Sequence, residues 1–163
     1  MYQPESRESL GGQKLIRKAD FHLGQKVNTF FRIRCRVTDP ANDKKHFSGA
    51  DKRHVTMYAS LDGSLGYILP VPEKTYRRLL MLQNVLVTHI CHIAGLNPKV
   101  YRTYKSYVRN QGNPARGIID GDLVWRYLFL PNNEKADLAK KIGTRVQEII
   151  EDIIEIDRQT AHF

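Results

Sequence analysis

The chain has 163 residues, of which 41% are hydrophobic and 26% charged, an ordinary globular composition that argues against wholesale disorder. Its formal net charge is +9 and is unevenly placed: residues 134–163 carry seven acids against five bases, and the remaining residues carry 21 bases against ten acids. A basic body favours RNA, DNA or acidic protein surfaces as neighbours and does not determine the fold.

Several classes of protein are not expected. The two cysteines lie far apart, so we expect reduced thiols in a nuclear or cytosolic protein and no disulfide framework. A charged-then-apolar leader is not visible, so we expect no secretory signal. The most apolar stretch, Leu79–Leu96, is broken by polar side chains, which favours a buried helix over a membrane span.

Strands are expected in the part of the chain before Pro70-Val71-Pro72. The four candidates are Lys14–His22, Val27–Val37, His54–Ser60 and Leu65–Leu69. They amount to about one blade of antiparallel sheet, which cannot bury both of its faces and has two open edges. We therefore predict a first domain, residues 1–71, that is a partial sheet completed by something outside it.

Local patterns specify parts of that sheet. In the second strand Phe31, Ile33 and Cys35 point one way and the arginines between them point the other, which is typical of a strand with one solvated face. Those arginines, Arg32, Arg34 and Arg36, fit a solvated face better than a nucleic-acid site. Asp62-Gly63 predicts a tight hairpin. The charged segment Asp39–Lys52 predicts a long loop.

Helices are expected in a second domain, residues 72–163. The first begins at Pro72 and ends near Ala94, because Gly95 accepts a left-handed conformation. Asp120 and Asn133 are candidate N-caps, and Thr144 with Gln147 has the spacing of a capping box. The later predicted helices span Asn97–Val108, Asp120–Leu130 and Asn133–Gly143, and a last one begins at Thr144.

The first helix carries a broad apolar stripe. Its members are Leu79, Leu82, Leu86, Ile90 and Ile93. So wide a face implies contact on more than one side, and the chain offers too little sheet to cover it. We therefore expect the stripe to pack on a propeller or a partner outside this chain. We also expect the isolated chain to aggregate, or to unfold cooperatively only when upstream propeller sequence or a partner is present.

The segment Asn97–Ile119 contains bases and tyrosines but no acid. Cations for phosphates and aromatic faces for bases are what single-stranded nucleic acid requires. The alternative is a basic helix whose tyrosines pack on the sheet and whose charges meet water or an acidic partner. The candidate nucleic-acid-binding residues are Lys99, Arg102, Tyr104, Lys105, Tyr107 and Arg109.

Neither a metal site nor a catalytic site is expected. His89 and His92 share a helical face, but two ligands do not make a structural zinc site. Asp120 and Asp122 fit an N-cap and a first-turn acid better than a pair of catalytic carboxylates. A phosphate-binding loop, a dinucleotide-binding glycine pattern and a nucleophile elbow are all missing from the sequence, so we expect no cofactor and no enzymatic activity.

Long motifs connect the chain to a known family. They are GGQKLIRKADFHLGQKVNTFFR (Gly11–Arg32), ASLDGSLGYILP (Ala59–Pro70), EKTYRRLLMLQN (Glu73–Asn84), AGLNP (Ala94–Pro98), IIDGDLVWRYL (Ile118–Leu128), AKKIGT (Ala139–Thr144) and DRQTAHF (Asp157–Phe163). Together they resemble the C-terminal region of the CPSF-A family, the largest subunits of the cleavage and polyadenylation specificity factor. Relatives in splicing and in DNA-damage ubiquitination share the LQN-like core and the DGDL motif. AKKIGT and TAHF favour the polyadenylation subunit.

The resemblance implies a nuclear protein of three seven-bladed β-propellers with a helical C-terminal domain, of which this chain would be the last strands and that domain. It also implies a scaffold for pre-mRNA 3′-end processing. Such a scaffold holds a WD-repeat subunit and a zinc-finger subunit that read the AAUAAA signal, so pre-mRNA is contacted directly or through them. The alternatives are direct RNA binding through residues 99–116, or a related propeller adaptor in splicing or DNA-damage ubiquitination.

Overall fold

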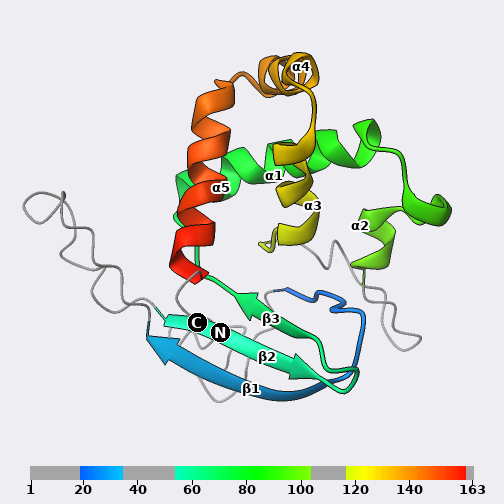
Figure 1. The fold of residues 1–163 in the computed structure, drawn as a ribbon, viewed down its shortest axis with the longest axis vertical. Coiled ribbons are helices and arrows are strands. Elements are labelled where there is room, and N and C mark those ends of the chain that lie inside the picture. Colours follow the sequence, from blue (N-terminus) through cyan, green and yellow to red (C-terminus); the bar gives the residue numbers. More distant parts are fainter. Residues whose placement is uncertain (1–18, 35–53, 104–116, 161–163) are drawn as a thin grey trace, which may run out of the picture.

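The computed structural model describes residues 19–34, 54–103 and 117–160, and consists of a small sheet followed by helices (Figure 1). The strands are β1 (Val27–Arg34), β2 (His54–Ser60) and β3 (Leu65–Ile68). They pair antiparallel in the order β1-β2-β3. In Figure 1 the helices gather on the β3 side of this sheet. The predicted mixed class, with strands first and helices after, is confirmed.

The set of strands differs from the prediction. Residues 19–22, the described end of the predicted strand Lys14–His22, form no strand. Their backbone turns to the helical region instead, where the His22 amide donates to the carbonyl of Arg102 at 3.0 Å. Residues 14–18, residues 35–37 and the loop Asp39–Lys52 lie outside the described residues. The seven-bladed propeller and the domain boundary after residue 71 stay predictions.

The register of β1 on β2 confirms the predicted alternation. Phe31 and Ile33 lie opposite Met57 and Val55, so these four side chains share one face of the sheet. Val55 and Met57 are buried there. On the other face Phe30 lies opposite Tyr58, with the two ring centroids 6.4 Å apart.

The predicted hairpin joins β2 to β3. Gly63 has φ 85°, a left-handed conformation that glycine adopts without steric cost. The carboxylate of Asp62 accepts hydrogen bonds from the Ser60 hydroxyl, from the Ser64 amide at 3.2 Å and from the Ser64 hydroxyl at 2.9 Å. An aspartate that satisfies the backbone of its own turn is a common device in tight turns.

Five α-helices and two 3₁₀ turns follow the sheet in the described residues. Their bounds are α1 (Glu73–His89), the 3₁₀ turn η3 (Ile93–Gly95), α2 (Pro98–Tyr101), α3 (Gly121–Trp125), the 3₁₀ turn η4 (Arg126–Phe129), α4 (Asn132–Ile142) and α5 (Val146–Thr160). The predicted helix Asp120–Leu130 is therefore α3 continued by η4. Most of the predicted extension of α2 toward Val108 lies outside the described residues.

The helix ends confirm some caps and correct others. Asp120 caps α3 by accepting from the Leu123 amide at 3.4 Å, and α4 ends at Gly143 as predicted. The prediction that Asn133 caps α4 was wrong, because the helix begins at Asn132 and its N-cap is Pro131. At the start of the last helix Thr144 donates to Glu148 at 2.6 Å, and Gln147 is not its partner.

The first helix is shorter than predicted. It ends at His89, because the next residue has an extended backbone and the Nε2 atom of His92 lies 2.8 Å from the carbonyl oxygen of Val87. The chain then forms η3, in which Ala94 has φ 50° and Gly95 has φ 71°. The stop predicted at Gly95 therefore terminates this turn and not α1.

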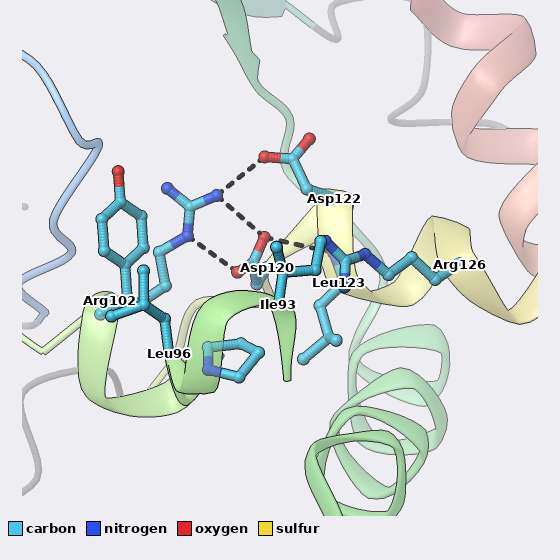
Figure 2. Close-up of a pocket in the computed structure, with 9 residues that line it drawn as sticks. Ile93, Leu96, Arg102, Asp120, Asp122, Leu123 and Arg126 are labelled. Atoms are coloured by element: carbon cyan, nitrogen blue, oxygen red, sulfur yellow. Dashed lines mark hydrogen bonds and ion pairs between the residues drawn. The ribbon is translucent and has the colours of Figure 1, made fainter. Parts of the chain in front are cut away.

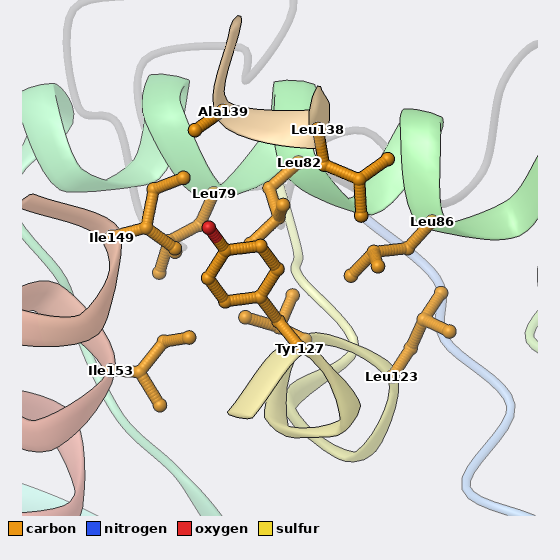
Figure 3. Packing of buried hydrophobic residues seen from close by; sticks show 10 residues of the cluster. Leu79, Leu82, Leu86, Leu123, Tyr127, Leu138, Ala139, Ile149 and Ile153 are labelled. Carbon is orange, nitrogen blue, oxygen red and sulfur yellow. The ribbon is translucent and has the colours of Figure 1, made fainter. Parts of the chain in front are cut away.

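The helices bury one apolar core among themselves (Figure 3). Its ten buried members are Leu79, Leu82, Leu86, Leu123, Val124, Tyr127, Leu138, Ala139, Ile149 and Ile153. They come from α1, α3, η4, α4 and α5, and α1 contacts each of α3, α4 and α5. Each fully buried leucine or isoleucine contributes roughly 1.5–3 kcal/mol relative to exposure. Among the described residues, every helix is too short or too polar to cross a membrane.

Candidate functional site

A charged cluster lies where the short helices meet (Figure 2). Arg102, which follows α2, donates from Nε to the Oδ2 atom of Asp120 at 2.8 Å and from a terminal nitrogen to Oδ1 at 3.2 Å. The same terminal nitrogen donates to Asp122 at 2.7 Å. The side chains of Arg102 and Asp120 are only 14% and 9% exposed. Two parallel hydrogen bonds between a guanidinium and a carboxylate form a strong and geometrically specific pair.

The cluster also connects segments that are distant in sequence. The other terminal nitrogen of Arg102 donates to the carbonyl of His22 at 3.2 Å, and its guanidinium lies 5.0 Å from the ring centroid of Phe21. The backbone amide of Asp120 donates to the side chain of Gln83 in α1 at 2.7 Å. We call Arg102, Asp120, Asp122, His22 and Gln83 the Arg102 cluster.

The electrostatics of the cluster follow from its burial and its partners. Burial by itself would lower the pKa of Arg102, but the hydrogen bond and charge of Asp120, with the charge of Asp122, raise that pKa above its ordinary value. Arg102 therefore stays charged at neutral pH. Tyr58 of β2 responds to the same charges: burial raises the pKa of its phenol, Arg102 opposes the rise, and Asp122 and Asp120 add to it.

The candidate nucleic-acid residues are not brought together as one described site. Tyr104, Lys105, Tyr107 and Arg109 lie outside the described residues. Lys99 is exposed in the first turn of α2. Arg102 is bound by two carboxylates and a carbonyl, so its charge is already compensated within the chain.

The apolar stripe of α1 divides between the core and the surface. Leu79, Leu82 and Leu86 are buried by the chain's own helices, which revises the expectation that an outside surface covers them. Ile90 is partly buried against the same core. Ile93 lies beyond the end of α1 and is 67% exposed. Packing on a propeller or a partner stays a prediction for the uncovered side chains.

The hydrogen bonds of Asp120 to Arg102 and Gln83 were missed from the sequence, although a signal for them existed. The capping role of Asp120 follows from its place before a helix, but its partners lie 18 and 37 residues away. Gln83 belongs to the LQN-like core and Asp120 to the DGDL motif, the two motifs that the resemblance singles out. Their occurrence in one family pattern could have suggested that they touch.

The histidines near the end of α1 have protein partners. Nε2 of His89 lies 2.9 Å from the carboxylate of Glu134 in α4, and His92 contacts the carbonyl of Val87. Within the described ranges, His, Cys, Asp and Glu residues do not gather in any group of three or more that could hold a metal ion. Cys91 is an exposed free thiol.

Comparisons with known proteins cover the residues of the Arg102 cluster. The family model described as the CPSF A subunit region matches residues 1–129. The chain is 56% identical over 163 residues to cleavage and polyadenylation specificity factor subunit 1 of Drosophila melanogaster, covering 100% of this chain and 11% of the relative.

More distant relatives carry related names. The chain is 37% identical over 164 residues to the probable cleavage and polyadenylation specificity factor subunit 1 of Caenorhabditis elegans, and 33% identical over 162 residues to protein cft1 of Schizosaccharomyces pombe. In both cases 99% of this chain is aligned, and it spans 11% of the length of the relative. Because one family model matches residues 1–129 and relatives from insect to yeast align over almost the whole sequence, the chain belongs to the CPSF A subunit family.

Proposed function

We propose that this chain is a scaffold piece of the nuclear machinery that cleaves and polyadenylates pre-mRNA, and that its role is to hold other subunits and not to catalyse. The proposal rests on family membership, because the relatives are named as subunits of the cleavage and polyadenylation specificity factor. A subunit of such a factor works in a complex with the other cleavage and polyadenylation factors.

The charges of the Arg102 cluster support a structural role. Its hydrogen bonds tie α1, α2, α3 and the segment before β1 to one another. Its arginine is neutralised by carboxylates, an arrangement that fixes geometry and leaves little charge for chemistry on a substrate. We propose that the helical region is a rigid end piece of the scaffold, that the sheet is part of a β-propeller, and that the WD-repeat and zinc-finger subunits are the partners held.

The test uses the protein that carries this chain in its own cells. The intact protein is replaced by a version that lacks residues 72–163. We expect the other cleavage and polyadenylation subunits to co-purify poorly with the shortened protein, and transcripts to read through their normal 3′ ends. Normal co-purification together with normal 3′ ends would refute the scaffold role of this region.

Direct contact with RNA through residues 99–116 is a separate possibility that the exposure of Lys99 favours. Lys99→Glu in the isolated chain should weaken binding of a single-stranded RNA and flatten its salt dependence if this residue contacts phosphate. Arg77→Glu, an equal charge change on α1, is the control. Unchanged affinity in both variants would remove Lys99 from the candidate RNA site.

A further inference from the structure

The turn after α1 displays two aliphatic side chains on the surface. The amide of Leu96 donates to the carbonyl of Ile93 at 3.0 Å, and Ala94 between them has φ 50° and ψ 29°. A left-handed backbone is uncommon for a residue other than glycine, and such outliers concentrate at functional positions. The side chains of Ile93 and Leu96 are 67% and 66% exposed. The strained turn therefore places two apolar side chains on the surface and outside the core.

These side chains form one wall of an open groove (Figure 2). The groove has a volume of about 250 Å³ and is lined also by Pro98, Tyr101, Leu123 and Arg126. Sites for small molecules usually measure roughly 300–1,000 Å³. The groove is thus better matched to one or two side chains of a peptide than to a free metabolite.

Two arginines and two aspartates line the groove, so their formal charges cancel, but they are paired unequally. Asp120 and Asp122 also line it, but both accept hydrogen bonds from Arg102. Arg126 is half-buried and, among the described residues, has no hydrogen-bond or ion-pair partner. A partly desolvated guanidinium without an anion is unfavourable, and arginine is the cation best suited to bind a carboxylate in a protein interface. The basic excess of residues 1–133 also attracts an acidic partner.

We propose that this groove binds a short segment of another protein in which a bulky apolar side chain lies close to an aspartate or glutamate. The apolar side chain fills the space between Ile93, Leu96 and Leu123, and the carboxylate pairs with Arg126. The inference deepens the proposed scaffold role and rests on it, because it states the chemistry of one partner that the scaffold holds.

A peptide fits the groove better than RNA. Tyr101 is the one aromatic side chain among the described lining residues. Its ring and the His22 ring are nearly perpendicular with their centroids 5.2 Å apart, and the guanidinium of Arg102 lies 5.2 Å from the Tyr101 ring centroid. Single-stranded RNA requires free aromatic faces on which successive bases stack, whereas the exposed aliphatic surface here offers none.

The experiment measures peptide binding by the intact protein that carries this chain. A displayed library of random 12-residue peptides is selected on that protein, and synthetic versions of the enriched peptides are measured by fluorescence anisotropy. We expect the enriched peptides to share a large apolar residue near an acid. Affinity should fall at least about tenfold with Arg126→Glu and with Ile93→Asp, and much less with Arg126→Lys, which keeps the charge.

The control variants change exposed residues away from the groove. Arg77→Glu matches the charge change and Met81→Asp matches the apolar-to-acid change, and both lie on exposed positions of α1. We expect neither to alter peptide affinity, and circular dichroism must show that all variants are folded. If a groove variant is unfolded, the milder Ile93→Ser and Arg126→Gln take its place.

Three results would overturn the proposal. The first is a selection that enriches no peptide, or only peptides without an acid. The second is unchanged affinity in Arg126→Glu and Ile93→Asp. The third is binding of a 12-nucleotide uridine RNA that these two variants abolish, which would make the groove an RNA site. If Arg126→Glu abolishes peptide binding but the other subunits still co-purify normally, the groove binds a peptide that the scaffold does not need for holding those subunits.

Discussion

The helical region closes an apolar core of its own and the sheet does not, although both regions also expose large apolar side chains. The helices bury Leu82, Leu86 and Tyr127 completely against one another, so that region provides its own core. The sheet buries Val55 and Met57 but leaves several large apolar side chains exposed on its strands. These are Phe30, Phe31, Leu65 and Ile68. Large apolar surface on a small sheet is typical of a surface that another part of a protein covers.

The difference teaches which region can be stable by itself. A region with a closed core can fold cooperatively, whereas a sheet with exposed apolar faces and two edges depends on what packs against it. The expectation that the whole chain is incomplete therefore applies to the sheet more than to the helices. The four predictions below test this distinction, and they run from the largest expected effect to the smallest.

Removing the arginine of the Arg102 cluster should have the largest effect. Arg102→Met leaves the nearly buried carboxylate of Asp120 without its cation, and breaking a buried ion pair in this way costs about 3–5 kcal/mol of unfolding free energy. Urea denaturation measures the loss. Arg77→Met, which removes an arginine that is 75% exposed, is the matched control and should change stability by less than about 0.5 kcal/mol. Equal effects of the two substitutions would show that the cluster does not hold the regions together.

Truncating a core leucine should lower the unfolding free energy far more than truncating a leucine of the sheet. Leu82→Ala creates a cavity between α1 and its neighbours and should lower the unfolding free energy by about 2–5 kcal/mol. Leu65→Ala makes the same chemical change at a residue that is 64% exposed, and should change stability by about 0.5 kcal/mol or less. The contrast between the regions fails if thermal or urea denaturation gives similar losses for both.

Polar substitution on the sheet should improve solubility at little cost in stability. Leu65→Ser combined with Ile68→Thr removes exposed apolar surface from β3, so self-association of the isolated chain should decrease while its melting temperature changes by only a few degrees. Light scattering over a range of protein concentrations measures the first effect and circular dichroism the second. If self-association is unchanged, the apolar surface that causes it lies outside β3. Met81→Ser then tests whether the exposed surface of α1 is responsible.

The smallest expected effects on stability come from two carboxylates, one in each region, and they depend on acidic pH. Hydrogen bonds from the Thr144 hydroxyl and then from the Arg145 amide lower the pKa of Glu148 at the start of α5. Hydrogen bonds from Ser60 and Ser64 lower the pKa of Asp62 in the hairpin. A depressed folded-state pKa stabilises the protein above the unfolded pKa of about 4, and the benefit is lost as pH falls through the folded value.

The contribution of each carboxylate's charge to stability can therefore be measured by varying the pH. Glu148→Gln and Asp62→Asn should each be slightly less stable than the original chain at pH 7, and the difference should shrink as pH falls below about 4 and vanish once both carboxylates are protonated. Melting temperature against pH measures it. A stability difference that stays constant across this range would mean that neither hydrogen-bonded carboxylate contributes through its charge.

Local chemistry made much of the fold predictable. The Asp62-Gly63 hairpin, the cap at Asp120 and the stop at Gly143 depend on one or two residues each, and such signals can be read directly. The end of α1 could not be read from the sequence, because the extended backbone that follows His89 is stabilised by contacts as much as by sequence pattern. The covering of Leu79, Leu82 and Leu86 was missed because apolar periodicity shows that a face is buried but not what buries it.

The candidate site was predictable only in part, for the same reason. The basic character of Lys99 and Arg102 is plain in the sequence, and it suggested phosphate. Whether a cation is available to bind phosphate depends on which side chains the fold places beside it. Asp120 is distant from Arg102 along the chain but forms an ion pair with it in the fold. Arg126 received no attention from the sequence, since its importance comes from lacking such a neighbour among the described residues.

Position 24 shows how little sequence variation the junction of the two regions can tolerate. Gly24 has φ 97°, and a β-carbon added there would collide with the hydroxyl oxygen of Tyr101. Any other amino acid would both strain the backbone and displace the tyrosine. A substitution at Gly24 should therefore loosen the contact between the segment before β1 and α2, even though the residue carries no side chain of its own.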